Sequence, residues 1–128
     1  MMSMLSNSYS IKDENFDTDI YLNDISQIVD HLQANLDPIV HEPKRLSILL
    51  ILTKNSNLTF SLLQKMVNTT SGNLTNHLKH LSNNKLVEIS RTFLHSRART
   101  LISITPLGVE KLHEYFSLFQ DTFNKFDI

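Results

Sequence analysis

Apolar residues recur at helical spacing in three long segments of the chain. In residues 25–36 they fall three or four positions apart, which predicts an amphipathic helix that Asp37–Pro38 brings to an end. Residues 45–52 are apolar on nearly all sides, and Pro43 suits the first turn of a helix, so a buried central helix is expected here. A third, long amphipathic helix is predicted over residues 106–126.

Shorter elements are predicted between the second and third of these helices. A brief extended segment at residues 58–60 leads into a short helix over residues 61–67. A tight turn then ends at Thr70, which can cap a further helix over residues 71–83. The apolar side chains that we expect to face inward from these two helices are Leu62, Leu63, Met66, Leu74, Leu78 and Leu81.

A β-hairpin is predicted after the second of these short helices. Residues 86–93 and 99–104 are strand-like, and residues 94–98 form a polar, basic turn between them. Two short helices joined by a tight turn and followed by a hairpin describe a winged helix-turn-helix. The sequence therefore predicts a mainly α-helical fold with a small β-hairpin wing. We expect one domain over residues 20–128, with its core at 36–105, and a flexible acidic arm at 1–19.

The composition excludes several classes of protein. The chain of 128 residues has no cysteine, so disulfides, thiolate metal sites and cysteine nucleophiles are excluded. Its longest apolar run, Ile48–Leu52, is far shorter than the ~20 residues that span a bilayer. There is no phosphate-binding glycine loop and no arrangement typical of catalytic side chains. We expect a cytoplasmic protein that is not an enzyme and has no cofactor.

Charge is distributed unevenly along the chain. Residues 1–42 contain eight acidic residues and Lys12 as their one basic residue, whereas residues 43–105 contain nine lysines and arginines and Glu88 as their one acid. A basic middle segment indicates an anionic partner, and nucleic acid is the first candidate. A basic surface that is merely solvated is the alternative.

The predicted helix over residues 71–83 has no acidic residue. Its polar side chains both donate and accept hydrogen bonds, as base edges in a major groove require, and the cations near its later turns suit phosphates. Arginines in the hairpin suit the minor groove or the DNA backbone. The expected DNA-binding residues are Ser71, Asn73, Thr75, Asn76, His77, Lys79, His80, Arg91, Arg97 and Arg99, with Lys44, Arg45, Lys54 and Lys65 as further candidates for phosphate contacts.

The last predicted helix carries more large apolar residues than the core of a small winged helix needs. We expect it to form a dimer interface together with the first helix. A dimer would place two recognition helices on successive major grooves, about 34 Å apart, and would favour a pseudo-palindromic site. The expected interface residues are Ile25, Ile28, Leu32, Leu112, Tyr115, Phe116, Phe119 and Phe123.

Residues 36–49 and 72–81, together with the pairs Arg99–Thr100 and Thr105–Pro106, resemble winged-helix transcriptional regulators of the MarR/ArsR-like group. The nearest match is the small branch with the pattern DPxIHxxxRLxIL. The resemblance covers about residues 36–119. It implies DNA binding as a homodimer, with the helix residues Ser71, Asn73, Thr75, Asn76 and His77 at the groove and Arg97 and Arg99 in the wing.

The sequence departs from the family pattern at residues 83–85. Asn83–Asn84–Lys85 replaces the glycine-containing turn that is usual before the wing. Because asparagine tolerates the left-handed backbone conformation, we expect the same turn.

Two alternatives to a DNA-binding regulator stay open at this point. The histidine pair His77 and His80, or His113 with Glu114, raises the option of a metal-responsive regulator, although the chain offers no cysteine ligand. A winged helix used only for contacts with proteins is the other alternative, and the acid-free helix and the wing arginines argue against it. No residue pattern selects a small-molecule effector.

Overall fold

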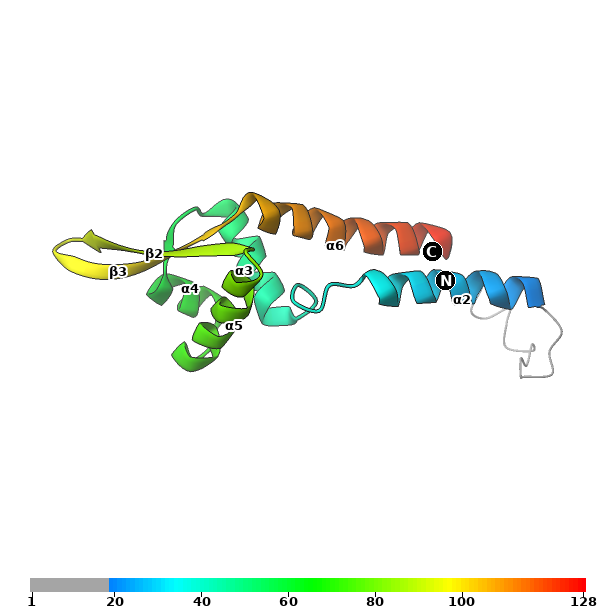
Figure 1. The fold of residues 1–128 in the computed structure, drawn as a ribbon, viewed down its shortest axis with the longest axis horizontal. Helices are drawn as coiled ribbons and strands as arrows, with labels where there is room; N and C mark the ends of the chain where they lie inside the picture. The colour runs from blue at the N-terminus through cyan, green and yellow to red at the C-terminus, as the bar shows by residue number, and fades with distance from the viewer. Residues whose placement is uncertain (1–18) are drawn as a thin grey trace.

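The computed structural model describes residues 19–128 (Figure 1). Apart from Asp19, the predicted acidic arm lies outside the described residues. The prediction of a mainly α-helical fold with a hairpin wing is confirmed. The elements in chain order are α2 (Asp19–Asn35), α3 (Pro43–Lys54), β1 (Leu58–Thr59), α4 (Phe60–Val67), α5 (Ser71–Asn83), β2 (Val87–Leu94), β3 (Arg97–Ile104) and α6 (Pro106–Lys125).

Helix α3 lies at the centre of the hydrophobic core. Its residues Ile48, Leu49 and Leu52 are almost fully buried, as the apolar run in the sequence predicts. Glu42 caps its N-terminus, and Pro43 occupies the first turn, where a backbone N–H would have no helical partner. The other core residues come from the neighbouring elements: Val40, Leu58, Leu63, Val67, Leu74, Leu78, Leu81, Leu86, Val87, Ile102 and Leu112.

Helix α4 turns a different face to the core from the one expected. Leu62 and Met66 are 47% and 46% exposed, while Leu63 and Val67 are buried, so the expectation that Leu62 and Met66 face inward is wrong. Leu62 and Met66 are four residues apart, as helical packing requires, and so are Leu63 and Val67. The second pair is displaced from the first by one position along the helix. Packing against α3 and β3, rather than local periodicity, selects the pair with Leu63.

The sheet is antiparallel, in the order β1-β3-β2. Strands β2 and β3 form the wing, which projects away from the helices at one end of the molecule (Figure 1). Its turn is shorter than predicted, because only His95 and Ser96 separate the strands. Both have positive φ, 53° and 63°, as a two-residue hairpin turn of the type I′ class requires.

A Schellman motif joins α5 to the wing. The N–H of Leu86 donates to the carbonyl of Leu81, and the N–H of Lys85 donates to that of Ser82, both at 2.9 Å. The left-handed residue is Lys85, with φ of 63°, whereas Asn84 has φ of −92°. The turn is therefore the one expected, but a lysine rather than an asparagine adopts the left-handed conformation.

The first turn of α6 packs directly against this junction. Thr105 caps the helix by accepting a hydrogen bond from the N–H of Gly108 at 3.0 Å. A side chain at Gly108 would collide with the carbonyl oxygen of Leu86 and with Ile104, so only glycine fits here. This contact fixes where α6 leaves the core.

Helices α2 and α6 run antiparallel, side by side, and extend from the core on the side opposite the wing (Figure 1). The α2 residues Ile25, Ile28 and Leu32 are half-buried. Among the described residues, no helix has both the length and the apolar character that crossing a membrane would require.

Candidate nucleic-acid interface

Helix α5 presents a polar face to solvent because its leucines anchor the opposite face. Leu74, Leu78 and Leu81 are buried against α3 and the sheet. Thr70 holds the first turn in place by accepting a hydrogen bond from the N–H of Asn73 at 3.1 Å. We call the exposed residues of this helix that carry predicted DNA contacts the recognition face: Ser71, Asn73, Thr75, Asn76, Lys79 and His80.

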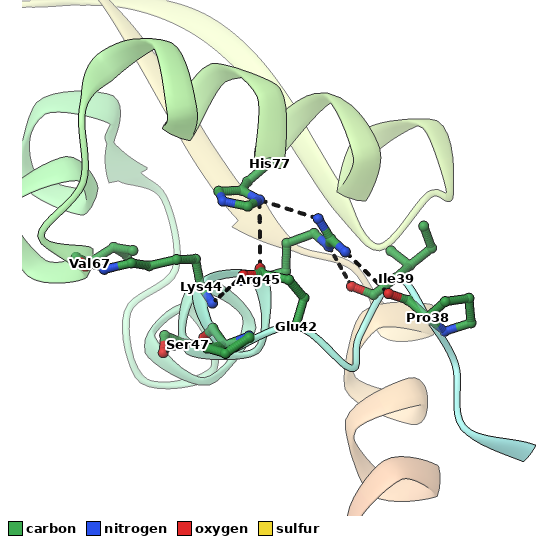
Figure 2. Close-up of polar contacts among 9 residues, drawn as sticks. Pro38, Ile39, Glu42, Lys44, Arg45, Ser47, Val67 and His77 are labelled. Atoms are coloured by element: carbon green, nitrogen blue, oxygen red, sulfur yellow. Dashed lines mark hydrogen bonds and ion pairs between the residues drawn. The ribbon is translucent and has the colours of Figure 1, made fainter. Parts of the chain in front are cut away.

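His77 does not belong to the recognition face, although it was among the expected DNA contacts. Its side chain is only 17% exposed and points toward the start of α3 (Figure 2). Its Nδ1 lies 3.3 Å from Nη1 of Arg45 and 3.6 Å from Oε2 of Glu42. His77 follows Leu74 by three residues on the helix, and it therefore lies at the edge of the buried face.

Arg45 and Lys44 are occupied by contacts within the protein. Arg45 donates from Nε to the carbonyl of Ile39 at 2.6 Å and from Nη2 to that of Pro38 at 3.1 Å. Lys44 donates from Nζ to the last carbonyls of α4 and its cap, Val67 and Asn68, at 3.0 and 3.1 Å. These contacts hold the α2–α3 connection and α4 on α3 (Figure 2). These internal contacts occupy both cations, which the sequence offered as candidates for a phosphate contact or as plain surface charges.

Glu42 is the acidic member of this cluster. Its carboxylate accepts hydrogen bonds from the backbone N–H groups of Lys44 at 3.1 Å and Arg45 at 2.7 Å. Burial acts to raise the pKa of Glu42, but these two backbone donors and the nearby His77 and Arg45 side chains together lower the pKa below its ordinary value. Glu42 is therefore ionised at neutral pH, and the acid next to α5 is committed to a helix cap.

The wing arginines lie on both faces of the hairpin. Arg91 pairs with Thr100, and Arg99 and Arg97 pair with Thr92 and Leu94. Because paired residues share a face and successive residues alternate, Arg91 lies on one face and the other two arginines lie on the opposite face. Within residues 19–128, no ion pair or side-chain hydrogen bond occupies any of the three.

The face with Arg91 looks toward α5. Ile89 and Thr100 on that face line a cavity of about 480 Å³ together with Thr75 and Lys79 of the recognition face. The structure thus brings Arg91 to the same side of the molecule as the polar residues of α5. Arg97 and Arg99 extend the cationic surface around the other face of the wing.

The expected dimer residues divide into a buried and an exposed group. Leu112 is 5% exposed and packs in the core, so the prediction that it contributes to a dimer interface is wrong. Tyr115 donates or accepts a hydrogen bond with Nδ1 of His41 at 2.9 Å, and Phe119 packs near the same imidazole. Phe116 and Phe123 are about half exposed.

Metal binding finds little support in the arrangement of possible ligands. In the part of the chain that the structure describes, no three His, Cys, Asp or Glu side chains gather closely enough to hold an ion. His77 faces Arg45, a cation, while His80 lies on the exposed face. The two imidazoles therefore have different surroundings.

Comparison with known families and structures agrees with this arrangement. The family described as "winged helix DNA-binding domain" matches residues 44–122. The transcriptional regulator homologue protein from Pyrococcus horikoshii OT3 is 27% identical, with a TM-score of 0.66, over 83% of this chain and 99% of its own. No protein among those with curated descriptions matches the chain.

Two further solved structures share the fold at lower identity. The complex of S. aureus MepR with DNA is 19% identical, with a TM-score of 0.58, over 80% of this chain and 81% of its own. A MarR-family transcriptional regulator from Silicibacter pomeroyi is 18% identical, with a TM-score of 0.51, over 84% of this chain and 70% of its own. At these identities the two likenesses show that the chain shares the fold of those proteins.

Proposed function

The chain belongs to the winged helix DNA-binding domain family, and we propose that it is a transcriptional regulator that binds specific double-stranded DNA sequences as a homodimer. One observation carries the proposal. The recognition face of α5 has no acidic residue, is exposed along its length, and lies on the same side as Arg91 of the wing. An acid-free polar helix face beside cations is what a major groove flanked by phosphates requires.

We assign base and phosphate contacts by position on α5 and the wing. Asn73 and Asn76 lie in the first half of the helix, where recognition helices meet base edges, and an asparagine can pair bidentately with adenine. Ser71 and Thr75 lie beside them, while Lys79 and His80 lie further along and suit phosphates. The wing supplies cations for the minor groove or the backbone through Arg91, Arg97 and Arg99.

The dimer proposal rests on apolar residues of α6 that the protomer leaves exposed. Val109, Phe116 and Phe123 are each at least one-third exposed and lie seven residues apart, so they form one line along the helix. The α2 residues Ile25, Ile28 and Leu32 are half-buried, and we assign them to the same interface. A two-fold axis beside helices α2 and α6 would direct the two copies of α5 in a dimer toward one duplex. Such a dimer would favour a pseudo-palindromic site.

Titration with random-sequence duplex DNA tests the proposal at its base. We expect binding at ~50 mM salt that weakens steeply as salt rises, because cation–phosphate contacts release counterions. Selection of bound duplexes from a random pool should then yield a two-fold related sequence. Asn76→Ala should cost ~1–3 kcal/mol mainly at one base position. No binding at ~50 mM salt would favour a winged helix that contacts only proteins.

Gel filtration across a dilution series tests the dimer separately. Phe123→Glu should lower the dimer fraction, because it adds a charge to the exposed apolar line. Ser117→Glu adds the same charge to another exposed position of α6 and should not change the elution volume. Equal behaviour of the two variants would contradict the proposed interface.

A further inference from the structure

The tip of the wing carries an aromatic residue for which the protomer offers no packing partner. Phe93 is 76% exposed, more than any other large apolar residue of the described chain except the final residue, Ile128. Its cross-strand partner is Ala98, whose methyl group covers little of the ring. Leu94, the next residue, is also exposed, on the opposite face of the hairpin. Leaving a phenylalanine in water forgoes the favourable free energy that burial of its ring would supply.

Cations surround this apolar tip. Arg91 and Ala98 share the face of Phe93, while Arg97 and Arg99 lie on the other face, and His95 forms the turn. The only acidic residue of the hairpin is Glu88, which pairs with Ser103 near its base. An aromatic ring set among cations suits a partner whose surface is anionic and whose interior is a stack of flat apolar rings. Duplex DNA has both properties.

The shape of the tip allows it to approach a narrow groove. The turn consists of two residues, and Ala98, which lies directly across from Phe93 on the same face of the hairpin, is small. His95 and Ser96 both hold left-handed backbone conformations without being glycine, a local cost that is common at functional sites. Apolar side chains that enter the minor groove partly unstack a base step and bend the duplex.

We propose that Phe93 acts as a wedge that enters the minor groove and opens a base step, while the wing arginines bind the flanking phosphates. The inference rests on the proposed DNA binding and extends it to a deformation of the duplex. Pyrimidine–purine steps unstack most easily, so the wing should favour sites with such a step beneath its tip. Part of the sequence preference would then come from DNA deformability rather than from α5.

The experiment uses a duplex selected from a random pool by the unmodified protein, with fluorescent dyes at its two ends. Energy transfer between the dyes should report a bend of roughly 20° or more on binding. Phe93→Ala should bind about tenfold more weakly and leave the duplex straight. Phe93→Leu, which keeps an apolar wedge, should retain the bend. Arg97→Ala should weaken binding and reduce the salt dependence, but the bound duplex should stay bent.

The outcomes separate this inference from the proposal beneath it. Binding and bending by Phe93→Ala equal to those of the unmodified protein would overturn the wedge and leave DNA binding intact. Loss of self-association in Phe93→Ala, with DNA bending unchanged, would assign the ring to a protein contact and also overturn it. Failure of the unmodified protein to bind any duplex would overturn both proposals. Because Phe93 is exposed, its substitution should leave thermal unfolding unchanged, which excludes misfolding as a cause.

Discussion

The basic residues of the middle segment fall into two groups with different surroundings. At the start of α3, Lys44 and Arg45 donate hydrogen bonds to backbone carbonyls, and Arg45 also meets His77. On the wing, Arg97 and Arg99 have no such partner within residues 19–128, and the hairpin that carries them projects away from the helices (Figure 1). Both groups contribute equally to a count of charge. Only the second is available to an external anion, so charge in the sequence overstates the binding surface.

Removing a cation that donates hydrogen bonds to backbone carbonyls should give the largest loss of stability. Arg45→Ala leaves the carbonyls of Pro38 and Ile39 without their donor and frees His77 from its contact. We expect a loss of about 2–3 kcal/mol in the free energy of unfolding and a lower melting temperature. Lys54→Ala, at an exposed position on the same helix, should change the free energy by less than ~0.5 kcal/mol. Urea unfolding of the two variants measures the difference.

Removing two wing cations should affect binding alone. Arg97→Ala combined with Arg99→Ala should weaken binding to all duplexes by roughly 10–100-fold at low salt and flatten the salt dependence by about two phosphate contacts. Its melting temperature should equal that of the unmodified protein. Lys125→Ala, at the far end of α6, is the matched control and should bind normally. A lower melting temperature of the double variant would show that the wing arginines stabilise the fold, as Lys44 and Arg45 do, and would contradict this prediction.

A substitution at Glu42 tests whether the ionised carboxylate stabilises the start of α3, where Lys44 and Arg45 lie. Because the pKa of Glu42 is lowered in the folded state, its ionised form stabilises the fold above the ordinary pKa of 4.5, and this contribution is lost as the pH falls through the lowered value. Glu42→Gln should therefore be less stable at pH 7 by about 1 kcal/mol, since a weaker acceptor caps α3. The difference in the free energy of unfolding between Glu42→Gln and the unmodified protein should be smaller at pH 3. Urea titrations at the two pH values measure it, and a constant difference would contradict the assignment.

Lys85 differs from both groups of basic residues. It is exposed, and the Schellman motif constrains its backbone conformation rather than its charge. Its φ of 63° favours glycine, so Lys85→Gly should stabilise the fold by about 0.5 kcal/mol. Asn84→Gly should instead destabilise it, because Asn84 has a negative φ that gives glycine no advantage. If both variants lose stability, the left-handed position is not under strain.

The sequence predicted most of the fold because its signals are local. Pro43 and the threonine caps Thr70 and Thr105 mark helix starts, and each lies within one residue of an observed boundary. The buried leucines of α5 follow from spacing alone. The error at Leu62 and Met66 arises because an eight-residue helix allows two apolar lines, and residues elsewhere in the chain decide between them.

The candidate site was harder to predict because it depends on distant contacts. His77 has the polarity of a groove residue, and its true partners, Glu42 and Arg45, lie more than thirty residues earlier in the chain. Leu112 has the spacing of an interface residue but is buried in the core, because Gly108 allows the start of α6 to pack closely against Leu86. The exposed tip at Phe93 has no sequence signal of its own, because strand residues of this kind are usually covered.

The absence of cysteine from the chain allows the central claim to be tested directly. Ser71→Cys places a single thiol on the recognition face, and Ser117→Cys places one on an exposed position of α6. The rate of maleimide labelling is measured for each variant with and without the selected duplex. We predict that DNA slows labelling at position 71 several-fold and leaves position 117 unchanged. Shielding of position 117 with free labelling at position 71 would contradict the claim that α5 docks on DNA.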